Sequence, residues 1–160
     1  MSNSPQQDFV IFKSKIKTLS LSTLTEDGRP NTSYAPFIED RSGHFYLFLS
    51  QLANHTQDLL KQPIASILLI EDEQDARQLF ARQRISYDCD VDIIQPEDSC
   101  YSEHLDNFEK SFGSIIPLLR NLPDFILFKL TPIAGRYVQG FGKAYQLTGE
   151  HLTELEHISA

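Results

Sequence analysis

Two closely spaced arginines form the most informative cluster of charge in the sequence. Arg82 and Arg84 are two residues apart in a segment, Gln78 to Ile94, whose alternation predicts one long strand, so both side chains would leave the same face. Asn54 and His55 open a predicted helix, where free backbone N–H groups and the dipole favour an anion. If the fold brings these segments together, they would hold a phosphate or carboxylate. The pattern alone favours the alternative, a solvated strand face and an ordinary helix cap.

The other reactive side chains give weaker signals. His55, in a first helical turn, would oppose the helix dipole when charged, so it matters only if it faces a bound anion. Asp124 precedes an apolar run and is typical of a turn that enters a strand. Gly140-Phe141-Gly142 lacks the third glycine and the following helix of a dinucleotide fingerprint. Cys89 and Cys100 have no metal-ligand spacing and are expected to be free, packed thiols.

Composition narrows the classes of partner. The chain has 160 residues, 41% hydrophobic and 22% charged, and a formal net charge of −8. An acidic excess opposes binding to nucleic acid and to anionic membranes. No apolar run approaches the roughly 18 residues of a membrane helix, and the polar N-terminus has no signal-peptide pattern. We therefore expect a cytoplasmic protein with a single domain, residues 1–160, without nucleic-acid or membrane partners.

The first part of the chain predicts a helix followed by an antiparallel meander. Ser4 before Pro5 is a helix-start signal, and polar turns separate the apolar runs that follow. Asn54 and Gln57 have the spacing of a capping box, with Asn54 as the N-cap. The expected elements are a short helix at 5–15, a strand from 18 to the turn at 26–28, strands at 31–38 and 44–50, and a helix at 54–61.

The second part predicts further strands around a helical insertion. A continuously apolar run after Pro63 suits a central strand that is buried on both sides. The C-terminal tail, residues 149–160, is expected to form an amphipathic turn or helix. The expected elements are strands at 64–70 and 78–94, a helical insertion at about 97–122, strands at 125–130 and 137–147, and a final turn or helix at 150–158.

This order of elements predicts a mainly β protein. Six or seven mostly antiparallel strands, with a helix between the third and fourth, fit a small β-barrel with peripheral helices better than a sandwich.

Three segments, in this order and spacing, resemble the HugZ/HutZ haem-utilisation family. They are Gly28 to Phe37, Ile70 to Glu73 followed by Gln78 to Arg84, and Val138 to Tyr145. The resemblance extends from about Lys17 to Leu147. It implies a split barrel of the flavin-reductase and pyridoxamine-phosphate-oxidase type, and a homodimer with ligand sites at the subunit interface.

The resemblance also implies roles for individual residues. In flavin-binding relatives, a Ser-Arg-Lys segment before the capping helix and an arginine on the fifth strand hold the FMN phosphate. Asn54 and His55 stand in the first segment, where its arginine and lysine are missing, and Arg82 and Arg84 match the fifth-strand position. Ser33 lies about where the oxidases have a second-strand arginine.

In haem-degrading members, an acidic residue hydrogen-bonds near the haem across the dimer, and Asp124 matches it. The family's iron ligand is a histidine beyond the last strand. His157 is the nearest histidine in this sequence, and His55 is the alternative.

Three functions follow as hypotheses. The first is a protein of haem utilisation that binds haem and releases its iron by degradation. The second is an FMN-dependent oxidoreductase, and the third is a non-catalytic dimer that binds a tetrapyrrole or another anion.

Overall fold

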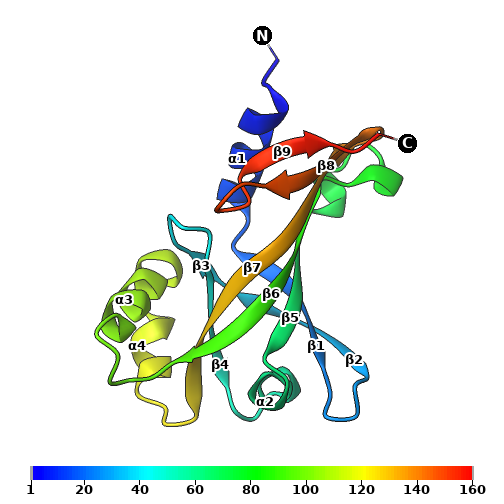
Figure 1. Ribbon diagram of the computed structural model, residues 1–160. Coiled ribbons are helices and arrows are strands. Elements are labelled where there is room, and N and C mark those ends of the chain that lie inside the picture. The colour runs from blue at the N-terminus through cyan, green and yellow to red at the C-terminus, as the bar shows by residue number, and fades with distance from the viewer. Residues whose placement is uncertain (1, 160) are drawn as a thin grey trace.

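The computed structural model describes residues 2–159 and shows an open β-barrel with helices at its ends and on one side (Figure 1). The elements are α1 (Pro5–Lys15), β1 (Thr18–Leu24), β2 (Pro30–Pro36), β3 (Ile38–Glu39), β4 (Phe45–Ser50), α2 (Asn54–Lys61), β5 (Ile64–Ile70), the 3-10 turns η1 (Glu73–Asp75) and η2 (Leu79–Ala81), β6 (Arg84–Ile94), α3 (Tyr101–Phe112), α4 (Ile115–Arg120), β7 (Phe125–Gly140), β8 (Lys143–Thr148) and β9 (Glu154–His157).

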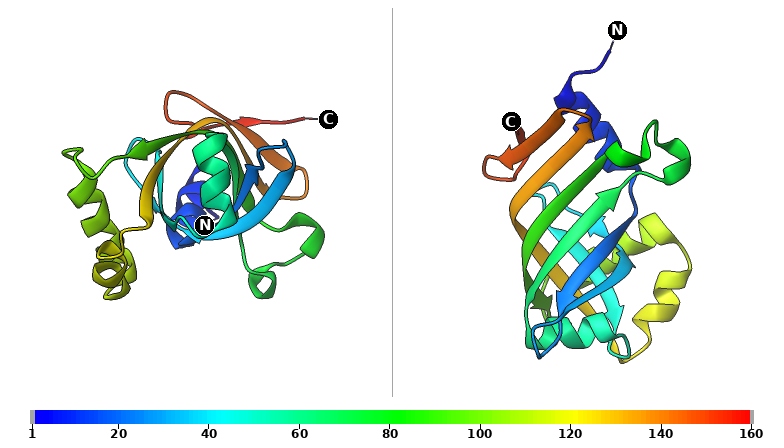
Figure 2. Two further views of the ribbon diagram at one scale, coloured as in Figure 1. Left: turned by 90° about the horizontal axis from the view of Figure 1, so that it is seen from below. Right: turned by 90° about the vertical axis from the view of Figure 1, so that its right-hand side faces the viewer.

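One antiparallel sheet forms the barrel, in the order β2-β1-β5-β6-β7-β4-β3; β8 also pairs with β7, and β9 pairs with β8. The two ends of this path, β2 and β3, do not pair with each other, so the barrel stays open. Figure 2 shows the strands curving around α2 in the view along the barrel. This arrangement confirms the predicted mainly β, split-barrel class.

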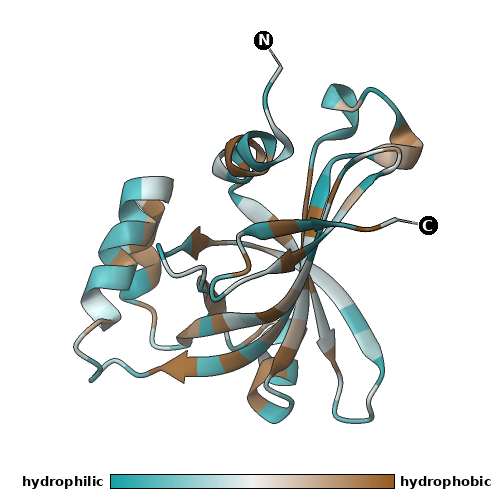
Figure 3. Cartoon of the chain, turned by 45° about the horizontal axis from the view of Figure 1, so that its top comes forward, coloured by the Kyte–Doolittle hydropathy of each residue, from teal (hydrophilic) through white to brown (hydrophobic). Residues whose placement is uncertain are grey.

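Apolar and polar side chains alternate along the strands, so that the apolar ones fill the interior of the barrel. Leu19 and Leu21 on β1 and Ile85, Tyr87 and Cys89 on β6 point inward and are buried, while their sequence neighbours are exposed or partly exposed. Figure 3 shows hydrophobic and hydrophilic residues alternating along these strands. Burying the apolar side chains on one face supplies most of the driving force for closing the sheet.

α1 covers one end of the barrel. Ser4 caps it through a capping box with Gln7, as a serine before a first-turn proline predicts. Phe9 and Phe12 are buried, and the Phe9 ring meets the edge of Tyr137, with centroids 5.2 Å apart. The side chain of Lys13 points inward to Glu39, with an Nζ–Oε2 distance of 2.6 Å.

α3 and α4 form the helical insertion and lie against the outside of β4 and β7 (Figure 1). Their apolar sides build a second, smaller core with β4 and β7 around Tyr46, Leu105, Phe108, Ile116 and Leu127. Among the described residues, no helix is long and apolar enough to cross a membrane.

The strand predicted from Gln78 to Ile94 is wrong in its first part. β6 begins only at Arg84, and residues 71–83 form a projecting loop with two short 3-10 turns. Leu79 and Phe80 are 62% and 88% exposed, so the apolar residues that suggested a strand do not reach the core. Arg82 therefore precedes the strand, and it does not share a strand face with Arg84.

Two other predictions are corrected. The gap predicted between strands 125–130 and 137–147 is absent: β7 runs without a break from Phe125 to Gly140. The predicted interruption at Gly140 and Gly142 is a tight turn, and β8 follows it. Pro132 is tolerated inside β7 because it lies opposite Cys89, where the register of the β6–β7 pairing shifts. A proline, which has no N–H to donate, is accepted in a sheet at such an irregularity. The tail is not a turn or helix throughout: it ends in the short strand β9, which pairs with β8.

Candidate functional site

α2 closes the end of the barrel opposite α1 and carries a polar network beneath it (Figures 1 and 2). Asp58 is 8% exposed and accepts hydrogen bonds from the Thr23 hydroxyl at 2.7 Å and from the Asn31 amide at 2.9 Å. A buried carboxylate needs such donors, since isolated burial of a charge is costly. These contacts fix α2 against β1 and β2, and thereby fix the place of His55.

His55 and Ser33 meet in this region. The His55 Nδ1 lies 2.7 Å from the Ser33 hydroxyl oxygen, which in turn lies 3.4 Å from the Leu21 carbonyl oxygen. A hydroxyl has one proton. If Ser33 donates it to Nδ1, the ring proton is on Nε2; if Nδ1 donates to Ser33 and Ser33 donates to Leu21, the Nε2 lone pair is free. Burial lowers the pKa of His55 although Asp58 opposes that shift, so the ring is neutral at neutral pH.

Asn54 does not cap α2. The N-cap is Ala53, which has no side chain to accept a hydrogen bond, and Asn54 is the exposed first residue of the helix. The capping-box prediction is therefore wrong by one residue. Gln57 instead donates from its side chain to the Gln51 carbonyl at 2.8 Å and ties the helix to the preceding turn.

Asp124 lies at the same end of the barrel, at the start of β7. Its Oδ2 accepts a hydrogen bond from the Ser50 hydroxyl at 2.6 Å, and its backbone carbonyl accepts one from the Gln51 N–H at 2.8 Å. Leu52 and Leu122, close to these residues in sequence, are 89% and 43% exposed. This end therefore combines an imidazole, a carboxylate and exposed apolar side chains.

The two arginines lie toward the other end, beside the projecting loop. Arg82 donates from Nε and Nη2 to the Glu71 carbonyl, and its Nη1 is 3.9 Å from the Glu73 carboxylate. Arg84 donates one bond, to the Arg82 carbonyl at 3.0 Å. Arg82 is thus occupied by the loop itself, while most donors of Arg84 have no partner among the described residues.

His157 is also at this second end, on β9. Its Nε2 is 3.0 Å from the Gly142 carbonyl oxygen, and its ring packs edge-on to Tyr145 with centroids 5.4 Å apart. Because a carbonyl can only accept, Nε2 must carry the proton. That nitrogen is not free to bind a metal unless the contact to Gly142 breaks.

Within one chain the predicted residues therefore divide into two groups. The lower group, named for its place in Figure 1, contains Ser33, Asn54, His55 and Asp124; the upper group contains Arg82, Arg84 and His157. Ser33 and Arg84 are three strands apart, since Ser33 pairs at Leu21, Leu21 at Ile67, and Arg84 at Ile70. Strand spacing places their backbones on the order of 15 Å apart. Within one chain the arginines and His55 therefore do not meet, and their convergence on one pocket stays a prediction.

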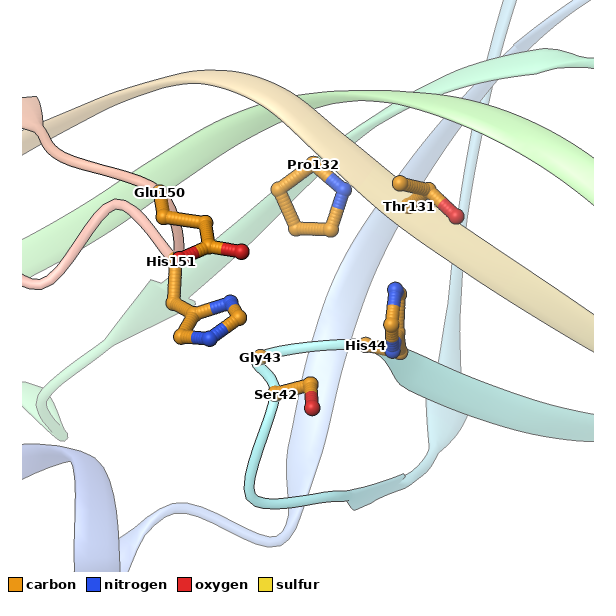
Figure 4. A pocket seen from close by; sticks show the side chains of 7 residues that line it. All are labelled: Ser42, Gly43, His44, Thr131, Pro132, Glu150 and His151. Carbon is orange, nitrogen blue, oxygen red and sulfur yellow. The ribbon is translucent and has the colours of Figure 1, made fainter.

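Sequence reasoning missed a histidine–carboxylate pair, His44 and Asp40. His44 lines a cavity of about 320 Å³ (Figure 4). His44 Nδ1 lies 3.0 Å from Asp40 Oδ2, which also accepts from the Tyr46 hydroxyl. Burial raises the pKa of Asp40, but hydrogen bonds, above all from the His44 N–H, outweigh it and lower the pKa overall. The sequence at 39–43 indicates only a turn. No three His, Cys, Asp or Glu side chains among residues 2–159 are placed to hold a metal ion.

Comparisons with known proteins agree on one family. The family model described as pyridoxamine 5'-phosphate oxidase matches residues 6–139. Heme oxygenase HutZ of Vibrio cholerae is 41% identical over 147 residues, which are 92% of this chain and 83% of that protein.

Two solved structures are similar along most of the fold. The crystal structure of HutZ, described as the heme storage protein from Vibrio cholerae, has a TM-score of 0.75 and 37% identity, over 79% of this chain and 88% of that one. The crystal structure of Campylobacter jejuni ChuZ has a TM-score of 0.85 and 28% identity, over 99% of this chain and 64% of that one.

Proposed function

Because the chain belongs to the pyridoxamine 5'-phosphate oxidase family, and within it to the HugZ/HutZ haem-utilisation branch, we propose that it is a haem-binding protein of haem utilisation. HutZ of Vibrio cholerae is described both as a heme oxygenase and as a heme storage protein, and both descriptions name haem. The observation that carries the proposal to this chain is the lower group: an imidazole whose Nε2 has no hydrogen-bond partner among residues 2–159, at the same end of the barrel as a carboxylate and exposed leucines.

These side chains fit haem in their chemistry. A neutral imidazole is the usual protein donor to haem iron, and a hydrogen bond on its other nitrogen fixes the ring. His55 meets both conditions in the tautomer that carries the proton on Nδ1, whereas the Nε2 of His157 is engaged with Gly142. Leu52 and Leu122 offer apolar surface to a macrocycle. Haem, when bound, supplies the iron at which oxygen and electrons are handled.

Asp124 has a separate role in this proposal. Ser33 already makes a hydrogen bond with Nδ1 of His55. Asp124 would therefore accept a hydrogen bond from a water at the open side of the site. A carboxylate in that place holds the water in one orientation.

The upper group supplies what the lower group lacks, namely cations for the two carboxylates of haem. Arg84 has free donors, but it lies too far from His55 in its own chain. We propose that a two-fold axis sets the upper end of one subunit against the lower end of the other, so that each of two equivalent sites is completed across the homodimer interface.

FMN fits less well. Its phosphate requires cationic donors, and only Arg84 of the two arginines has free ones, because Arg82 is already bonded to the loop that precedes β6. We therefore propose haem as the ligand. The test below also shows the result that each of the other two hypotheses, the flavoenzyme and the non-catalytic binder, would give.

The test is a titration of the purified protein with ferric haem. We expect a Soret band that saturates at one haem per chain, and loss of that band when a reductant and oxygen are supplied. A saturating band without turnover would indicate storage alone. A yellow protein with flavin absorption and no Soret saturation would contradict the proposal.

Ser33→Ala should weaken haem binding about tenfold, because loss of the partner on Nδ1 frees the ring to rotate and to change tautomer. Haem affinity measured by titration, with Ser33→Thr as the matched control that keeps the hydroxyl, checks this. Equal affinities for wild type and Ser33→Ala would show that Ser33 does not set the state of His55.

The protein should be a homodimer, with twice the 18.3 kDa mass of one chain. Light scattering over a range of concentrations measures this mass. A species of one chain's mass at all concentrations, with haem bound, would refute the shared site.

A further inference from the structure

The hydroxyl of Ser50, at the end of β4, donates one hydrogen bond and accepts another. It donates to Asp124 Oδ2 at 2.6 Å and accepts from the Leu52 N–H at 3.1 Å. The hydroxyl has one proton, and the N–H of Leu52 can only donate, so the proton of Ser50 is directed to Asp124. The backbone of Asp124 is held separately, by the Gln51 N–H.

These contacts fix Asp124 at its side chain and at its backbone. Ser50 pairs with Phe125 in the β4–β7 ladder, so its Cα is set by the sheet and not by a mobile loop. A hydrogen bond to a carboxylate is stronger than one between neutral groups, and it holds Oδ2 in one orientation. Oδ1 has no hydrogen-bond partner among residues 2–159 and is left to accept one. Ser50 also holds the turn that carries the exposed Leu52.

We propose that Ser50 is a positioning residue that orients Asp124 toward the haem site. This inference rests on the proposed function, but it concerns a residue to which neither the fold nor the family match gives a role. Ser50 does not touch the ligand. It acts through Asp124, by keeping Oδ2 occupied so that Oδ1 alone faces the site's water.

The test compares Ser50→Ala, Ser50→Thr, Asp124→Asn and the double variant Ser50→Ala/Asp124→Asn. In the ligand-free protein, the side-chain carboxyl carbon signal of Asp124 in a ¹³C NMR spectrum should shift in Ser50→Ala and return in Ser50→Thr. With ferric haem bound, the high-spin to low-spin band ratio of Ser50→Ala should move toward that of Asp124→Asn. Haem turnover should fall about three- to tenfold in Ser50→Ala, and Thr should restore it.

The double variant separates positioning from a general structural role. If Ser50 acts through Asp124, the double variant behaves as Asp124→Asn alone, because the effects of coupled residues do not add. Additive effects, or a Ser50→Ala protein with wild-type NMR signal and spectrum while Asp124→Asn is altered, would overturn the inference and leave the haem proposal intact. A wild-type protein that binds no haem, with the NMR shift present, would overturn the haem proposal and keep the orientation of Asp124 by Ser50.

Discussion

Replacement of His55 by alanine is expected to lower the affinity for ferric haem about a hundredfold. The substitution removes the imidazole whose Nε2 has no hydrogen-bond partner among the described residues, at the end of the barrel that also holds Asp124. Loss of an iron ligand or of the groups that support it costs one to two orders of magnitude or more. A titration that follows the Soret band, with the thermal midpoint measured in parallel to show that the variant folds, checks this.

His157→Ala is the matched control. The Nε2 of His157 is bound to the Gly142 carbonyl, so its loss should change the haem affinity by less than about threefold. A large loss in His157→Ala together with wild-type affinity in His55→Ala would reverse the assignment of the ligand.

The pH dependence gives an independent check on His55. Burial is the main cause of its lowered pKa, with Asp58 as the nearby charge that opposes it. A proton on the ring competes with iron, so the affinity should be constant from about pH 8 down to the ordinary histidine pKa of about 6.5 and fall only below it. An affinity that already declines between pH 8 and pH 7 would contradict a buried neutral ligand.

Lys13→Met is expected to cost about 3 kcal/mol of unfolding free energy. The side chains of Lys13 and Glu39 are only 13% and 22% exposed, and the Lys13 ammonium lies 5.3 Å from the ring centroids of both Phe9 and Tyr87. Removing one partner of such a pair leaves an uncompensated buried charge, which is the costly case. Urea unfolding measures the loss.

The double variant Lys13→Met/Glu39→Gln should recover most of this loss, because it leaves no unpaired charge. Burial outweighs the attraction of Lys13 and raises the pKa of Glu39. A raised pKa makes its contribution to stability largest below the unfolded value, near 4.5, and smaller as the pH rises through the folded value. Loss of the attraction from Lys13 should raise the pKa of Glu39 further, so that the stability of the variant depends more strongly on pH. The unfolding free energy of Lys13→Met should therefore increase between pH 7 and pH 5. A pH-independent loss would contradict the pairing.

Local signals in the sequence predicted most of the elements correctly. The side chains of Ser4 and Gln7 each accept a hydrogen bond from the other's backbone N–H within one turn of helix. The turn before β2 depends on Gly28, which adopts a positive φ. Neither feature depends on residues far away in the sequence. The Arg82 assignment failed for the opposite reason. Leu79 and Phe80 have the composition of a strand, but the loop closes through the contact of Arg82 with Glu71, eleven residues away in sequence.

The candidate site was only partly predictable because its parts lie far apart in sequence. His55 was identified from its helix, but the Ser33 contact that sets its ring depends on how α2 packs across β1 and β2. Asp124 was named by family resemblance, whereas Ser50 is 74 residues away and carries no pattern of its own. The division into an upper and a lower group follows from strand order, which alternation alone does not determine.

A heterodimer of two defective subunits tests the shared haem site most directly. His55→Ala removes a residue of the lower group and Arg84→Ala one of the upper group. If each site combines the two groups across the interface, a purified heterodimer has one site with both substitutions and one site with neither. We predict one tightly bound haem per heterodimer with wild-type affinity, while each homodimer of a single variant binds weakly. Weak binding by the heterodimer at both sites would place the whole site within one chain and contradict the shared-site account.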